Sequence, residues 1–140
     1  MSRALGIVAI SSGTVRTAGA VAAAGFVLVA SFQVALAVGI PWGRAAWGGA
    51  HDRLPRRLRV ASAFAAGLWV AAAIVILDAA GHDVSPVSSG AARWVAWVLF
   101  GLLALGALMN LASRSRWERF LMGPIAALLS LLCLVVALAG

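Results

Sequence analysis

Long apolar runs alternate with short arginine-bearing segments along the whole chain. Four runs carry no charged side chain, and they span residues 17–40, 60–77, 94–113 and 120–140, with lengths of 24, 18, 20 and 21 residues. A helix of roughly 20 apolar residues crosses the hydrocarbon core of a bilayer. Lipid also offers no partner to unpaired backbone groups, so a spanning segment of this kind must be helical. The pattern predicts an all-α fold, a four-transmembrane-helix antiparallel bundle that forms one integral membrane domain over residues 1–140.

Composition excludes a water-soluble fold. Of the 140 residues, 64% are hydrophobic and only 11% are charged. A chain this short keeps a large fraction of its residues at the surface, so water would meet much of that apolar material. The single cysteine, Cys133, lies inside an apolar run and excludes both an intrachain disulfide and a thiolate metal cluster. We interpret Cys133 as a small buried hydrophobe.

The first sixteen residues need a separate interpretation. Residues 4–10 are apolar but too short to span, and with Arg3 before them they look like the start of a secretory signal. Polar residues and Arg16 then interrupt the run before the first span begins. We therefore predict that residues 1–16 form an interfacial segment or an extended first turn of the first helix. A cleaved signal is the alternative.

The arginines predict which way the bundle faces. All eleven basic residues are arginines, and the N-terminal tail and the middle loop hold only three, Arg3, Arg16 and Arg93. The other eight lie between the first and second or the third and fourth runs: Arg44, Arg53, Arg56, Arg57, Arg59, Arg114, Arg116 and Arg119. Cytoplasmic loops are enriched in arginine, so we expect both basic loops in the cytoplasm and both termini outside.

The net charge of +7 therefore reflects orientation in a membrane, since the arginines flank apolar runs and form no stripe on a soluble face. We expect no nucleic-acid partner. The eight cytoplasmic arginines instead predict contact with anionic lipid head groups. Trp42, Trp47 and Trp117 lie at the same boundary, where amphipathic rings are enriched. Pro41 is predicted to end the first helix because it lacks a backbone donor.

Uncharged polar residues of the spans gather in the predicted cytoplasmic half. Gln33, Ser62 and Asn110 all lie near the inner ends of their helices. Amide side chains are unfavourable in lipid and turn toward the interior of a bundle. One interpretation is that they hydrogen-bond between helices, which stabilises a bundle by about 0.6–2 kcal/mol. The other is a polar binding pocket, roofed by His51, Asp52 and Glu118.

Candidate chemistry beyond this pocket is sparse. His51 and Asp52 could act as an acid–base pair, but sequence neighbours rarely face each other productively. Glu118 is expected to pair with a nearby arginine, or to bridge to the cluster at positions 56–59. His82, Asp78 and Asp83 are interpreted as a solvated outer loop and not as a metal site. We assign no catalytic residue, no metal and no cofactor from the sequence.

Three segments together resemble a family. FQVALAVGIPWGRAAWGG at residues 32–49, LPRRLRVAS at 54–62 and ALMNLASRSRWERFLMGP at 107–124 are similar to an uncharacterised family of small four-span bacterial integral membrane proteins. The similarity extends from Phe32 to Pro124. It implies the same four-span fold and a bacterial plasma membrane location. It brings no activity and no catalytic residue with it.

Three functions are consistent with these features. The leading hypothesis is a non-enzymatic structural or interaction module, whose basic loops contact anionic lipid or a partner protein. The second is an oligomeric channel or carrier for a small solute, with Gln33 and Asn110 in a cytoplasm-facing pocket. The third is a lipid-active enzyme at the interface, working through His51, Asp52 or Glu118. Alanine and glycine on several helix faces leave homo-oligomerisation open.

Overall fold

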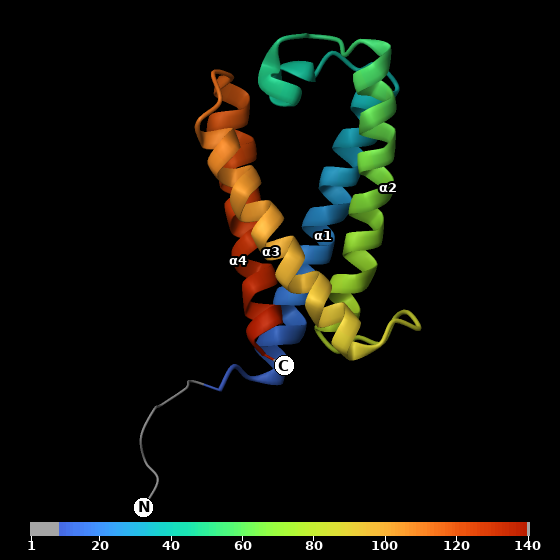
Figure 1. The fold of residues 1–140 in the computed structure, drawn as a ribbon, viewed down its shortest axis with the longest axis vertical. Coiled ribbons are helices and arrows are strands. Elements are labelled where there is room, and N and C mark those ends of the chain that lie inside the picture. The colour runs from blue at the N-terminus through green and yellow to red at the C-terminus, as the bar shows by residue number, and fades with distance from the viewer. Residues whose placement is uncertain (1–8, 140) are drawn as a thin grey trace, which may run out of the picture.

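The structure, a computed structural model, describes residues 9–139. Within them, four long helices pack side by side as an antiparallel bundle (Figure 1). The helices are α1 (Ser12–Ala37), α2 (Arg56–Ala79), α3 (Ser89–Leu111) and α4 (Gly123–Leu138), with a π-helical turn, η3 (Glu118–Met122), leading into α4. With η3 and α4 taken as one span, Glu118–Leu138, all four are long and apolar enough to cross a membrane, so the chain is a multi-pass membrane protein.

Helix α1 begins five residues before the predicted span. The Ser11 side chain caps it, because its Oγ accepts a hydrogen bond from the Thr14 amide at 3.1 Å. Such an N-cap stabilises a helix by about 1 kcal/mol. Arg16 consequently lies in the second turn of α1. The prediction for the N-terminal segment falls partly on residues 1–8, which lie outside the described residues.

Helix α1 ends through a glycine and not through Pro41. Gly39 adopts a φ of +94°, its amide bonds to the Leu36 carbonyl at 3.1 Å, and the Ile40 amide bonds to the Ala35 carbonyl at 3.0 Å. This pair of bonds is a Schellman motif, which satisfies the last carbonyls of the helix. Pro41 follows two residues later, where it cannot interrupt any helical hydrogen bond.

Helix α2 starts at Arg56, four residues before the predicted span. The prediction began at the first uncharged residue, yet the helix continues beyond the apolar run. Long arginine side chains can reach water or head groups from the end of a helix. The first turn of α2 therefore carries Arg56, Arg57 and Arg59, with Pro55 before it.

Two helical hairpins build the bundle, α1 with α2 and α3 with α4. Close approach of α1 and α2 holds the first hairpin, since a Cβ at Gly19 would overlap the Ala80 Cβ and come within 3.4 Å of the Ile76 carbonyl oxygen. Small residues drive helix association in lipid, where water supplies no hydrophobic force. Phe26 and Ile76 are fully buried in the core, and Phe26 stacks on Trp69 with ring centroids 5.3 Å apart.

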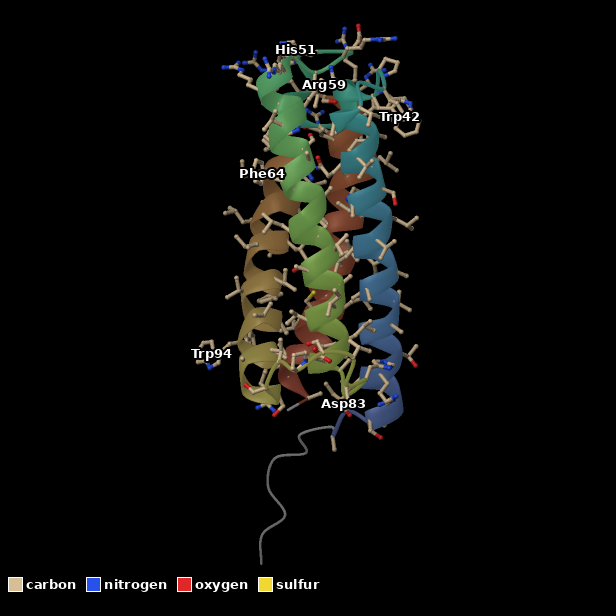
Figure 2. The ribbon with its side chains drawn as sticks, turned by 90° about the vertical axis from the view of Figure 1, so that its right-hand side faces the viewer. Trp42, His51, Arg59, Phe64, Asp83 and Trp94 are labelled. Atoms are coloured by element: carbon tan, nitrogen blue, oxygen red, sulfur yellow. The ribbon has the colours of Figure 1, made fainter. Side chains whose placement is uncertain are left out.

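The hairpins lie close together at one end and diverge at the other (Figure 1). At the diverging end lie the α1–α2 connection and the α3–α4 turn, with all eight arginines of the predicted cytoplasmic loops; we call it the basic end. Figure 2 shows Trp42, His51 and Arg59 at the basic end, and Asp83 and Trp94 at the opposite one. The chain enters α1 and leaves α4 at that opposite end.

Candidate functional site

The α1–α2 connection, residues 38–55, covers the basic end, and we call it the cap (Figure 1). It contains two short 3₁₀ turns, η1 (Gly43–Ala45) and η2 (Trp47–Gly49). The cap also folds on itself, because the Gly43 amide donates to the Asp52 carbonyl at 2.8 Å. Trp47 has a φ of +53°, in the left-handed region, where a non-glycine residue costs about 1–3 kcal/mol. The surrounding contacts must offset that strain.

The cap is attached to both hairpins by hydrogen bonds. On the α2 side, Trp47 Nε1 donates to Ser62 Oγ at 3.0 Å, and Ser62 is fully buried. On the α4 side, the Gly48 amide donates to Glu118 Oε1 at 2.8 Å. These two bonds come from adjacent cap residues, so they fix both the indole ring and the strained backbone beside it.

Glu118 is the centre of the second attachment. Its side chain is buried in the π turn, and its other oxygen, Oε2, accepts a hydrogen bond from Ser113 Oγ. Ser115 Oγ donates to the Arg44 carbonyl, which adds a further bond to the cap. Arg44–Asp52 is the one salt bridge within the described residues. The prediction that Glu118 forms an ion pair with an arginine is therefore wrong. A backbone amide and a hydroxyl group take its place.

A cavity of about 300 Å³ lies beneath the cap, between the diverging hairpins. Gln33, Asn110 and Glu118 line it together, with aromatic walls from Trp47 and Trp69. Gln33 Oε1 is buried and has no hydrogen-bond partner among residues 9–139. Hydrogen bonding between helices would need such a partner for this oxygen. Ligand cavities in proteins start at about this size.

His51 and Asp52 lie apart from this cavity, although the predicted pocket included both in its roof. Both are exposed at the outer face of the cap, and neither lines the cavity. Asp52 instead accepts a hydrogen bond from Arg44 Nε at 2.6 Å. That hydrogen bond and the charge of Arg44 hold the pKa of Asp52 below its usual value. The hydrogen bond to Asp52 and the negative charge of Asp52 in turn raise the pKa of Arg44.

A second feature of the basic end is a surface depression of about 510 Å³, lined by Arg44, Arg114 and Arg116 together with Trp117. An apolar depression of about 450 Å³ adjoins it, and Arg44 and Trp117 line both. Phe32 then connects the apolar depression to a groove of about 410 Å³ between α1 and α4. No Asp or Glu lines any of these three spaces in the described part of the chain.

The remaining arginines of the basic end lie elsewhere. Arg59 Nε donates to the Ala37 carbonyl at 2.8 Å and so satisfies the end of α1. Arg119 Nη2 donates to the Ser113 carbonyl at 2.7 Å, just beyond α3. Arg53, Arg56 and Arg57 are exposed. Of the predicted interfacial tryptophans, Trp42 and Trp117 line the apolar depression, whereas the indole N–H of Trp47 is bound to Ser62.

The opposite end of the bundle is closed by two local sets of hydrogen bonds. Arg16 donates to the Gly81 carbonyl and to His82 Nδ1, and His82 Nε2 donates back to the Arg16 carbonyl at 3.0 Å. Asp78 accepts from the amides of Val84 and Ser85. Between residues 9 and 139, no group of three or more His, Cys, Asp or Glu side chains could hold a metal ion.

No family model, no curated protein and no solved structure matches this chain. The resemblance to a family of small four-span proteins therefore stays a prediction. Two features of the basic end bear on function, the capped cavity and the arginine-lined depression.

Two contacts of the site were not predicted at all. The Gly48 amide and the Ser113 hydroxyl hold Glu118, yet Gly48 lies 70 residues before it in the sequence. The adjacent glycines at positions 48 and 49 are a sequence signal for a left-handed turn, as their φ values of +84° and +71° show. No local sequence pattern indicates which carboxylate such a turn contacts.

Proposed function

We propose that the protein is a non-enzymatic membrane module that binds anionic lipid at its basic end, in the cytoplasmic leaflet of a bacterial plasma membrane. Arg114 and Arg116, with Arg44, hold the lipid phosphate, and the groove between α1 and α4 takes an acyl chain. The observation that supports this is the shared lining, because Arg44 and Trp117 belong to both the basic and the apolar depression. An amphiphile with an anionic head group fits this arrangement, because its head group meets the basic depression and its acyl chain meets the apolar depression and the groove.

The arginines supply the preference for this lipid. A guanidinium group fits a phosphate with two parallel hydrogen bonds and stays charged at every physiological pH. The apolar groove adds shape but little free energy, since lipid tails in the surrounding bilayer are equally apolar. Asp52 partly offsets the charge of Arg44, to which it is hydrogen-bonded. Arg114 and Arg116 therefore carry most of the selectivity.

Lipid competition in nanodiscs tests this proposal. We expect the purified protein to enrich phosphatidylglycerol over phosphatidylcholine in its annulus, and added salt to weaken that enrichment. The double variant Arg114→Gln/Arg116→Gln should lose most of it. The matched control is Arg53→Gln/Arg57→Gln, which removes the same charge from exposed positions outside the depression.

Two results would contradict the proposal. Equal losses in the two double variants would assign the effect to the total charge of the basic end and not to the depression. Equal retention of phosphatidylglycerol and phosphatidylcholine by the unaltered protein would remove lipid selectivity altogether.

A further inference from the structure

The cavity under the cap has features that the lipid site does not use. It shares no lining residue with the arginine-lined depression, although Phe32 and Met122 also line the apolar depression and the groove between α1 and α4. Its polar lining differs in sign from that of the depression. Glu118 is the one charged side chain that lines it, and it is only 6% exposed. No arginine or histidine among residues 9–139 forms an ion pair with this carboxylate. A buried carboxylate without a counter-charge is costly in a protein, so a positively charged partner that donates to it would stabilise the site.

The acceptors in the cavity are not saturated. Each oxygen of Glu118 accepts one hydrogen bond, from Gly48 or from Ser113, and a carboxylate oxygen can accept two. Gln33 Oε1, from α1, adds a third acceptor to the lining, buried and without a partner in the described chain. Vacant acceptors on buried oxygens favour a ligand that carries N–H donors and positive charge.

Aromatic side chains complete the lining. Phe32, Trp47 and Trp69 contribute to the wall of the cavity, and aromatic faces attract cations through their quadrupole. The position of Trp47 is fixed by its bond to Ser62 and by a strained backbone, and strain of this kind clusters at ligand sites. Gly106 also lines the cavity, and a Cβ built there would meet nothing within 4 Å. The wall at Gly106 thus leaves room for a ligand.

The geometry points to this cavity as a binding site for a small organic cation, a protonated amine with an apolar or aromatic body. Its ammonium group donates to Glu118 and Gln33, and its body contacts the aromatic wall. The eight arginines of the basic end do not prevent this, because all are exposed and therefore screened by water and counter-ions, whereas Glu118 is buried. This site does not depend on the lipid proposal.

The inference can be tested by calorimetric titration of the purified protein with three probes of similar size and shape. Benzylammonium carries the charge and the donors, benzyl alcohol is neutral, and benzoate is anionic. We expect saturable binding of benzylammonium and binding of the other two that is weaker by about tenfold or more. Binding of benzyl alcohol or benzoate as tight as that of benzylammonium would overturn it, as would the absence of saturable binding by benzylammonium.

Variants locate the binding. Glu118→Gln keeps an acceptor for the Gly48 amide but removes the charge, and should weaken benzylammonium binding by about tenfold or more. Asp83→Asn is the matched control, because it removes an exposed carboxylate at the opposite end and should leave the affinity unchanged. Unchanged affinity in Glu118→Gln would refute the site.

Two variants test the cavity without altering Glu118. Gly106→Phe places a ring in the free space and should abolish binding, whereas Gly101→Phe, on an exposed part of α3, should not. Gln33→Leu should reduce the affinity several-fold while it raises the unfolding temperature, because it removes a buried oxygen without a partner. These variants decide the question even if Glu118→Gln fails to fold. Normal binding to a folded Gly106→Phe protein would place the amine outside the cavity.

Discussion

The backbone amide of Gly48 lies 2.8 Å from Oε1 of Glu118, so a residue of the cap and a residue of the turn before α4 are joined across 70 positions of sequence. This bond ties the α1–α2 hairpin to the α3–α4 hairpin at the end where the two diverge. It also places the carboxylate at the boundary between cap and cavity. The closure of the cap and the charge of the cavity therefore depend on one side chain.

Replacing Glu118 by alanine should destabilise the protein. The change leaves the Gly48 amide and the Ser113 hydroxyl without their acceptor, and losing a hydrogen bond to a charged group costs about 1.5–3 kcal/mol. We expect the free energy of unfolding in mixed micelles to fall by about 2–4 kcal/mol. Asp83→Asn, at an exposed position, should change it by less than about 0.5 kcal/mol. Similar small effects of both changes would mean that the cap does not depend on Glu118.

The two adjacent cap glycines should respond differently to alanine. Both have positive φ, but a Cβ at Gly48 meets nothing within 4 Å, whereas one at Gly49 comes within 2.6 Å of Ser115 Cβ. Gly48→Ala therefore adds backbone strain alone, about 1–2 kcal/mol. Gly49→Ala adds a clash that must move the cap away from the α3–α4 turn. We expect proteolysis at the cap to accelerate more in Gly49→Ala, and equal rates would contradict the close contact.

The pKa of Asp52 should rise toward its ordinary value when Arg44 is replaced by methionine. The guanidinium group lowers that pKa first through its hydrogen bond and then through its charge, and methionine supplies neither. A carboxyl group with a lowered folded-state pKa adds stability that is fully present above its unfolded-state pKa. That contribution is lost as the pH falls through the folded-state value. An NMR titration of the Asp52 carboxyl carbon measures the change, and an unaltered pKa would show that the ion pair is absent in solution.

Sidedness can be measured with introduced cysteines. The arginine distribution predicts that a membrane-impermeant maleimide labels Ser88→Cys in intact cells. Arg53→Cys, in the exposed cap, should react only after permeabilisation. The native Cys133 is fully buried within α4, so it contributes little background. Labelling with the opposite pattern would invert the orientation and place the basic end outside.

Much of the fold could be predicted because its signal is local. An uncharged apolar run long enough to span identifies each helix without any knowledge of its neighbours, and all four helices exist as predicted. The ends were less accurate for a physical reason. Arg56 and Arg57 lie before the apolar run but inside the helix, because their side chains extend out of lipid. At the end of α1, the positive φ of Gly39 acts two residues before Pro41 can.

The sequence predicted only those site residues whose position along a membrane-spanning helix indicates that they face the bundle interior. Gln33 and Asn110 lie near the ends of their helices at the basic end, and the structure places both in the lining of one cavity. The partner of Glu118 could not be found in this way. In the sequence, nearby arginines are the expected partners of Glu118. In the structure, the π turn instead directs its carboxylate inward to the amide of Gly48. Contacts across 70 residues depend on how the two hairpins diverge, and no local pattern encodes that.

The first turn of α2 has a consequence of its own. It carries Arg56, Arg57 and Arg59, three cations at the helix terminus whose dipole is also positive. Side chains of that sign weaken a helix start unless negative charge surrounds them. The first turn of α2 should therefore fray in a bilayer of uncharged lipids and become more helical in a bilayer that contains anionic lipids. A spin label at Leu58, in the same turn, would leave all three arginines in place and report the composition of the leaflet around it.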